Sequence, residues 1–198
     1  MANCVNLFDV WGTEQAPQGN KPFELVRFNG REVAVMPFTS TSVLAKLHYI
    51  DEAEARGYVH CNGADCVLCR LGRPVEERAL LPVYLPAQGT IGVIPISPSS
   101  RPGALRPQLL PLLRSGKSLA AFIRKVDQMN FAVGSSEVDP GDFRCDGLIE
   151  DFQRKLEAAE LDLTSVYPRL SNEALARVPG INAMLRLKGV PVGAGNQR

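Results

Sequence analysis

The chain has 198 residues and a formal net charge of +1, with 45% hydrophobic and 22% charged residues. This balance excludes a wholly disordered chain, and the longest apolar runs are too short to span a bilayer. No charged stretch followed by an apolar run opens the sequence, so we expect no export signal and a cytoplasmic protein. The length allows one elaborated domain or two small ones.

Short strands dominate the predicted elements. Residues 1–22 include the polar stretch Thr13–Lys21, which contains Pro and Gly and predicts an N-terminal arm. Asn29-Gly30 lies between the first two β-prone runs, and this dipeptide is a strong hairpin signal. The segment 39–74 that follows them is expected to be irregular. The predicted strands are Phe23–Phe28, Glu32–Phe38, Glu76–Pro86, Thr90–Ile96, Leu119–Val126 and Asn130–Val138.

Apolar residues at helical spacing predict helices at Ala104–Leu113 and Asp146–Glu160. Two more short helices are expected at Ser171–Val178 and Ile181–Leu187, separated by Pro179-Gly180. Six short strands, one interior helix and a helical C-terminal third fit a small antiparallel barrel better than βαβ units. We therefore predict a mainly β, α+β protein with an OB-like barrel, which is a five-stranded Greek key. This core is expected at residues 23–140, and a helical segment at 141–198.

Three of the five cysteines are close together in the sequence, at Cys61, Cys66 and Cys69. An odd number of cysteines in a chain with no export signal argues against a disulfide framework, and the C-x4-C-x2-C spacing indicates structural zinc. A tetrahedral site needs a fourth ligand, and the two histidines of the chain, His48 and His60, are the candidates. Adjacent residues in an extended chain point in opposite directions, so His60, next to a cysteine ligand, is the less favoured of the two. A closed site with four protein ligands is structural rather than catalytic.

The resulting pattern, H-x12-C-x4-C-x2-C from His48 to Cys69, resembles the zinc signature of the T4-type phage single-stranded DNA-binding proteins. In that family a zinc subdomain interrupts an OB fold. The resemblance implies a zinc subdomain at residues 39–74 and one structural Zn²⁺. It also implies binding to single-stranded DNA in replication or recombination, in a bacterial host cell if the protein is phage-encoded.

A protein that binds single strands needs aromatic faces for base stacking and cations for phosphates. Residues 101–133 carry six basic residues and one acidic residue, whereas residues 134–165 carry nine acidic and three basic residues, whose role stays open. In a regular strand Phe122 and Arg124 share one face while Lys125 points to the other, so at most one of these two cations is a direct contact. The predicted contacts are Arg27, Tyr49, Tyr58, Arg70, Arg73, Tyr84, Phe122, Arg124 and Lys125.

Other functions remain possible at this stage. The near-neutral charge favours a zinc-stabilised protein-interaction module within a larger nucleoprotein assembly, and RNA is an alternative ligand to DNA. Replication or recombination proteins are the expected protein partners, and no membrane partner is expected. Gly116-Lys117-Ser118 resembles the end of a phosphate-binding loop, but Pro111 stands where that loop requires its first glycine. Asn62 stands where a zinc deaminase has its glutamate, and no Ser-His-Asp arrangement fits, so we expect no enzymatic activity.

Overall fold

The computed structural model describes residues 23–39, 41–52, 55–115, 117, 119–139 and 147–191. Over these residues the protein is mixed α+β, which confirms the predicted class. The chain divides into two compact units. Unit 1 comprises Lys46–Glu77 and the described residues from 167 to 191, and unit 2 comprises residues 23–45 and 78–166. The expected N-terminal arm at 1–22 lies outside the described residues.

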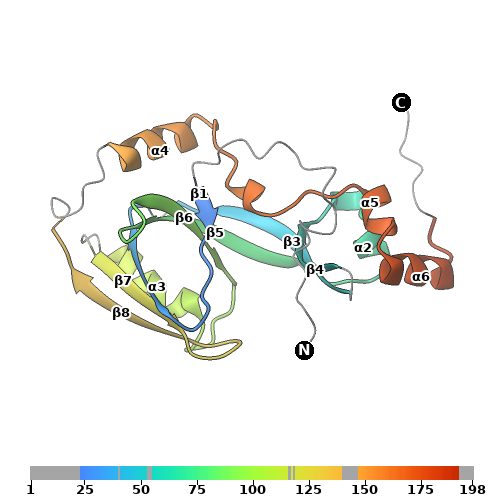
Figure 1. Cartoon of the computed structure of the whole chain (residues 1–198), viewed down its shortest axis with the longest axis horizontal. Coiled ribbons are helices and arrows are strands. Elements are labelled where there is room, and N and C mark those ends of the chain that lie inside the picture. The colour runs from blue at the N-terminus through green and yellow to red at the C-terminus, as the bar shows by residue number, and fades with distance from the viewer. Residues whose placement is uncertain are drawn as a thin grey trace. The chain divides into compact units, whose positions relative to one another are not determined.

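Unit 2 is built on a curved sheet (Figure 1). Its strands are β1 (Phe23–Leu25), β2 (Glu32–Pro37), β5 (Glu76–Leu85, which begins in unit 1), β6 (Thr90–Ile96), β7 (Leu119–Lys125) and β8 (Phe131–Glu137). Their order is β1-β6-β5-β2-β7-β8. β1 pairs with β6 in parallel, and the other neighbours pair antiparallel. No pairing joins the two ends of this order among the described strands, so the sheet is open rather than a closed barrel.

The predicted β1–β2 hairpin is wrong, although both strands exist. Gly30 has a φ of +87°, so the chain does turn at Asn29-Gly30. Residues 32–35 of β2 pair with β7 and residues 36–37 pair with β5, however, and β1 pairs with β6 instead. These long-range pairings override the local turn signal.

The core of unit 2 lies between the sheet and helix α3 (Leu105–Arg114). Alternate residues of β5 and β7 face it, as strand geometry requires. Its fully packed members include Val35, Leu81, Val83, Ile94, Leu105, Leu109, Ala121 and Ile123. The amphipathic helix α4 (Leu148–Glu157) buries Phe152, which meets Phe23 and Phe38 edge-on with ring centroids 5.9 Å apart in both pairs. The short turn η3 (Leu163–Val166) ends the unit.

A side chain of α3 covers part of the free edge of β8. Gln108 donates from Nε2 to the carbonyl oxygen of Phe131 at 2.9 Å and accepts at Oε1 from the backbone nitrogen of Val133 at 3.2 Å. The carboxamide therefore supplies the donor and the acceptor that a further strand would bring. Covering an edge in this way protects a sheet against pairing with another chain.

Unit 1 joins two segments that are distant in the sequence. The first contains β3 (Val43–Glu52, which begins in unit 2), β4 (Ala55–His60), the turn η1 (Gly63–Asp65) and α2 (Val67–Arg70), and the second contains α5 (Asn172–Ala176) and α6 (Pro179–Lys188). β3 and β4 form an antiparallel hairpin. Its core is formed by Ile50, Ala55, Val59, Val67, Leu68, Leu71, Leu175, Ala176, Val178, Ile181 and Leu185.

Two predictions for these regions require correction. The segment 39–74, expected to be irregular, contains the β3–β4 hairpin. Strand alternation was hidden there because His48, a polar residue, is completely buried. The helices of the expected C-terminal segment 141–198 divide between the units, since α4 belongs to unit 2 while α5 and α6 belong to unit 1. Pro179 starts α6 at a position where a proline needs no hydrogen-bond partner. Among the described helices, none has the length and the apolar character that a membrane span requires.

Candidate metal centre and surrounding residues

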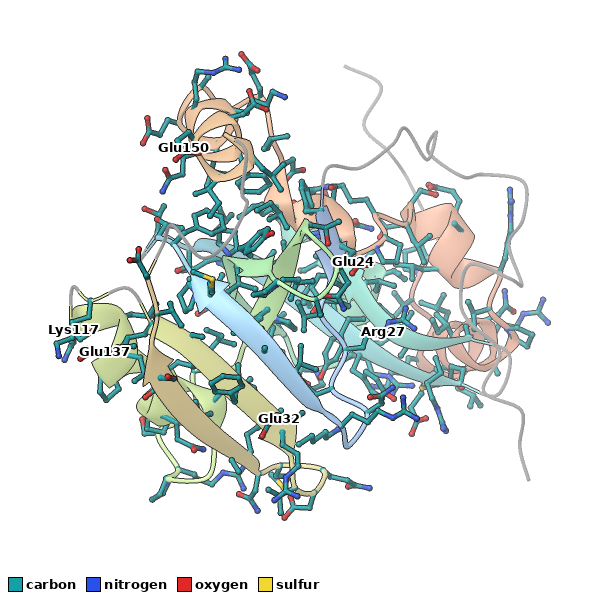
Figure 2. All side chains as sticks on the ribbon, turned by 60° about the vertical axis from the view of Figure 1, so that its left-hand side comes forward. Glu24, Arg27, Glu32, Lys117, Glu137 and Glu150 are labelled. Atoms are coloured by element: carbon teal, nitrogen blue, oxygen red, sulfur yellow. The ribbon has the colours of Figure 1, made fainter. Side chains whose placement is uncertain are left out.

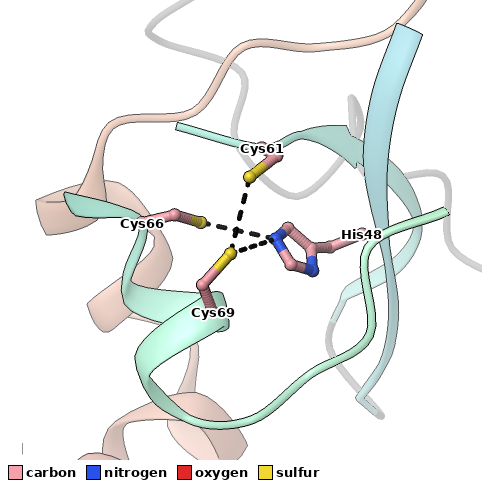
Figure 3. Close-up of side chains that lie close together, drawn as sticks. All are labelled: His48, Cys61, Cys66 and Cys69. Carbon is pink, nitrogen blue, oxygen red and sulfur yellow. Dashed lines mark hydrogen bonds between the residues drawn. The ribbon is translucent and has the colours of Figure 1, made fainter. Parts of the chain in front are cut away.

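Four side chains of unit 1 converge on one point (Figure 3). They come from β3, from the residue after β4, and from both sides of the first turn of α2, and they are His48, Cys61, Cys66 and Cys69. Their ligand atoms all lie within 4.8 Å of one another. Nε2 of the histidine is 3.5 Å from Sγ of Cys66 and 3.3 Å from Sγ of Cys69. Tetrahedral bonds of about 2.3 Å separate ligand atoms by roughly 3.5–3.8 Å, so this arrangement can hold a metal ion.

The orientation of His48 is fixed by its second ring nitrogen. Nδ1 lies 2.9 Å from the carbonyl oxygen of Pro74, which is a hydrogen bond in the tautomer that leaves Nε2 free to bind a metal. Burial lowers the pKa of His48, although the hydrogen bond to Pro74 acts in the opposite direction. The neutral imidazole that a metal requires is therefore favoured. His60 is not part of the group, because its ring lies against Tyr167 with centroids 6.5 Å apart.

The thiols of Cys66 and Cys69 resist ionising together. Burial raises the pKa of the Cys69 thiol, the hydrogen bond with Cys61 and the charge of Cys66 raise it further, and it reaches about 12. Burial also acts to raise the pKa of Cys66, but hydrogen bonds to backbone groups, that of Cys69 first, lower it below its usual value. Each negative charge opposes the next at these distances. A divalent cation removes that conflict, because it stabilises all the thiolates at once.

The segment from Cys61 to Gly72, here called the metal knuckle, is folded by two glycines and a short helix. Gly63 and Gly72 have φ values of +76° and +80°, which side-chain-bearing residues rarely adopt. The backbone nitrogen of Arg70 donates to the carbonyl of Cys66 at 3.1 Å, and that of Gly72 donates to the carbonyl of Cys69 at 2.8 Å. These bonds place the two thiols of the C-x2-C pair on one side of the turn.

The predicted nucleic-acid contacts of unit 1 differ in their surroundings. Tyr49 is 40% exposed, and its ring centroid lies 5.0 Å from that of Tyr58. Tyr58 is half-buried and donates a hydrogen bond from its hydroxyl to Glu76 at 3.1 Å. Arg70 is exposed and donates to the carbonyl of Asp65 at 3.3 Å.

Arg73 is placed differently from Arg70. Its guanidinium forms an ion pair with Glu52 at 2.5 Å and also approaches Sδ of Met184 at 3.8 Å. This cation therefore has a structural partner within unit 1. The pairing was not visible in the sequence, because the partners lie 21 and 111 residues away.

In unit 2, Phe122 and Arg124 lie on one face of β7, and the sheet core is on the other. Phe122 is half-buried and Arg124 is exposed, whereas Lys125 is half-buried on the core side of the strand. Arg27 is exposed after β1 (Figure 2). Tyr84 is only 4% exposed, because β5 is buried on both of its faces. Its ring belongs to the interior and is unavailable for stacking, contrary to the prediction.

The register of the sheet adds residues that the sequence did not single out. Phe122 lies opposite Ala34 on β2 and opposite Gly134 on β8, so neither residue directly opposite it carries a large side chain. Arg124 lies opposite Glu32 and Ala132 in the same register. Cross-strand neighbours can be assigned only after the strand pairing is known, and no local signal marks them.

Comparison with known proteins gives no relative. No protein-family model matches the chain, no curated protein matches it, and no solved structure matches it.

Proposed function

We propose that the protein binds single-stranded DNA without sequence specificity, using an OB-like unit 2 and a unit 1 held by one structural Zn²⁺. The observation that carries the proposal is the face of β7 opposite the core, where the half-buried Phe122 and the exposed Arg124 stand two residues apart. An aromatic ring next to a cation is the pairing that a non-specific single-strand binder needs, since the ring stacks on a base and the cation meets a phosphate.

The small neighbours of Phe122 strengthen this interpretation. The residues directly opposite the ring, Ala34 and Gly134, are small, which favours the approach of a planar base. Stacking of one base on an aromatic side chain contributes about 1–3 kcal/mol. Tyr49 offers a second exposed ring, in unit 1.

The strand order supports an OB-like unit 2. β2 is flanked by β5 and β7, β5 continues to β6, β7 continues to β8, and α3 connects β6 to β7. In an OB fold the first strand is likewise flanked by the second and fourth, and a helix commonly joins the third and fourth. β1 pairs in parallel with β6, at the edge where the fifth strand of an OB barrel closes. The metal-binding segment is inserted in the chain between β2 and β5, which correspond to the first and second strands of an OB fold in this comparison.

The donor set supports zinc as the metal. Thiolates select soft or borderline ions, and a group of three sulfurs and one imidazole nitrogen is typical of structural zinc. All four positions would be filled by protein, so no position remains for a reacting water. The role assigned to the ion is to hold the β3–β4 hairpin against α2, which fits a binding protein rather than an enzyme.

The test is a titration of labelled oligo(dT), oligo(rU) and a duplex of equal length with the zinc-loaded full chain. We expect binding to oligo(dT) that weakens with salt, since phosphate contacts release counterions. Phe122→Ala should weaken it by about 5- to 150-fold, the equivalent of one stacked base. Leu187→Ala, which shortens an exposed apolar side chain on α6, is the control and should leave the affinity unchanged.

Two results would change the proposal. Equal affinity for oligo(rU) would make the ligand single-stranded nucleic acid in general. No binding to any nucleic acid at low salt would overturn the proposal and favour the zinc-stabilised protein-interaction module instead.

A further inference from the structure

Asn172, the first residue of α5, contacts the metal knuckle on both sides of Cys66. Its Oδ1 accepts a hydrogen bond from the backbone nitrogen of Val67 at 3.1 Å, and its Nδ2 donates to the carbonyl of Asp65 at 3.0 Å. The same Oδ1 accepts from Nδ2 of Asn62 at 3.0 Å. The Asn172 carboxamide therefore hydrogen-bonds the backbone immediately before and after Cys66. It also hydrogen-bonds the side chain of the residue that follows Cys61.

The position of Asn172 is itself fixed by the segment around it. Ser171 caps α5 by accepting from the backbone nitrogen of Ala174 at 3.1 Å. Asn62 also donates to the carbonyl of Leu170 at 2.9 Å. Leu175, one turn further along, is fully buried in the core of unit 1. The carboxamide thus has little freedom to move away from the knuckle.

Helix α6 contacts the other end of α2. Lys188 donates from Nζ to the carbonyl of Leu71, the C-cap of α2, at 2.8 Å. Ile181 and Leu185 of α6 are buried in the same core as Leu68. Both ends of the short helix that carries Cys69 are therefore held by residues more than 100 positions later in the chain.

We propose that Asn172 is a positioning residue of the metal centre and that α5 and α6 belong to that centre. The inference rests on the metal site and is independent of nucleic-acid binding. Asn172 touches backbone groups beside the ligands rather than the ligand atoms, so it acts by fixing where the thiolates point. Groups of this kind typically change metal affinity by 10- to 100-fold.

Metal binding and docking of the helices are then linked in both directions. If docked helices strengthen metal binding, the bound metal must strengthen docking by the same factor. Removal of the metal should therefore loosen residues 172–188 as well as the knuckle. This links the C-terminal part of the described chain to the occupancy of a site built mainly from residues 48–69.

The test measures zinc affinity of the full chain by competition with a chromogenic chelator. We expect wild type to bind one zinc and Asn172→Ala to bind it 10- to 100-fold more weakly. The Co²⁺-loaded variant should show altered visible absorption bands, because the thiolates no longer hold their tetrahedral positions. Gln108→Ala is the matched control, since it removes a carboxamide that hydrogen-bonds backbone groups of β8 in unit 2, at 2.9 and 3.2 Å. It should keep the wild-type zinc affinity.

Amide hydrogen exchange supplies a second measurement. Chelation of the metal should increase exchange in residues 172–188 of the wild-type chain. Unchanged zinc affinity in Asn172→Ala would overturn the inference, and so would an equal loss in Gln108→Ala, which would indicate general destabilisation. Wild-type protein that binds no zinc would overturn the metal site and this inference together, whatever its affinity for oligonucleotides.

Discussion

Replacing Glu32 with glutamine should increase the affinity for single-stranded DNA. Glu32 lies directly opposite Arg124 in the β2–β7 register, and both side chains are exposed. In the proposed complex its carboxylate would place a negative charge near the phosphate that Arg124 meets.

The size of the effect follows from the repulsion between Glu32 and a phosphate. Two like charges roughly 7 Å apart in water repel by about 0.6 kcal/mol. Removing one of them predicts a roughly threefold lower Kd.

The assay is fluorescence anisotropy of labelled oligo(dT) at low salt, comparing wild type with Glu32→Gln. The control is Glu137→Gln, which removes the same charge from the other end of β8, where Glu137 pairs with Lys117 (Figure 2). Five residues of strand separate position 137 from Ala132, the β8 neighbour of Arg124, which is roughly 17 Å. The gain should shrink as salt is raised, because salt screens exposed charges.

Two outcomes would refute the reasoning. If Glu32→Gln binds no better than wild type, Arg124 is not at the phosphate path. If Glu137→Gln gains as much, the effect belongs to the net charge of the protein and not to the face of β7.

Four further predictions concern metal, pH and stability. Chelation should abolish the cooperative thermal transition of unit 1 while that of unit 2 persists, and a single unchanged transition in calorimetry would contradict the structural role of the metal. His48 has a lowered pKa in the folded state, so in the metal-free protein its contribution to stability is present above pH about 6.5 and is lost as the pH falls below that value; urea unfolding at pH 7.5 and 5.5 would show this as a lower midpoint in acid. Gly180→Ala should lower the urea midpoint despite the better helix propensity of alanine, because the new Cβ would lie 1.9 Å from Oε2 of Glu52, and Glu52 would have to leave its ion pair with Arg73 to make room; a raised midpoint would contradict this packing. Gln108→Ala should cost about 1–3 kcal/mol and promote association through β8, measured by urea unfolding and sedimentation, whereas a monomer of wild-type stability would contradict its role at that edge.

The metal ligands could be predicted because the information is local. Three cysteines at short spacing define a knuckle, and His48 follows from the direction in which neighbouring residues point. The same histidine obscured its own strand, since a buried polar residue interrupts the apolar alternation of β3. The histidine of the candidate metal site thus weakened the signal for the strand that carries it.

The contacts that Asn172 makes with the metal knuckle could not be predicted in the same way. Asn172 lies 105 residues after Val67, and a short polar residue at the start of a helix is ordinary in sequence. Tyr84 is a wrongly predicted contact. An aromatic residue close to a basic one in the sequence suggests an exposed ring, but β5 is covered on both faces.

Arg70 and Arg73 illustrate what decides the use of a surface cation. Both follow the knuckle closely, and the sequence offers no reason to treat them differently. Arg73 forms an ion pair with Glu52, and the carboxylate of Glu52 lies close to Gly180 near the start of α6. The charge of Arg73 therefore helps to join two segments of unit 1 that are distant in the sequence. Within the described part of the chain, Arg70 donates only to the backbone carbonyl of Asp65, at 3.3 Å, and is exposed, so its charge remains available to a phosphate. Arg70→Ala should therefore weaken DNA binding and flatten its salt dependence at unchanged stability, whereas Arg73→Ala should lower the stability of unit 1.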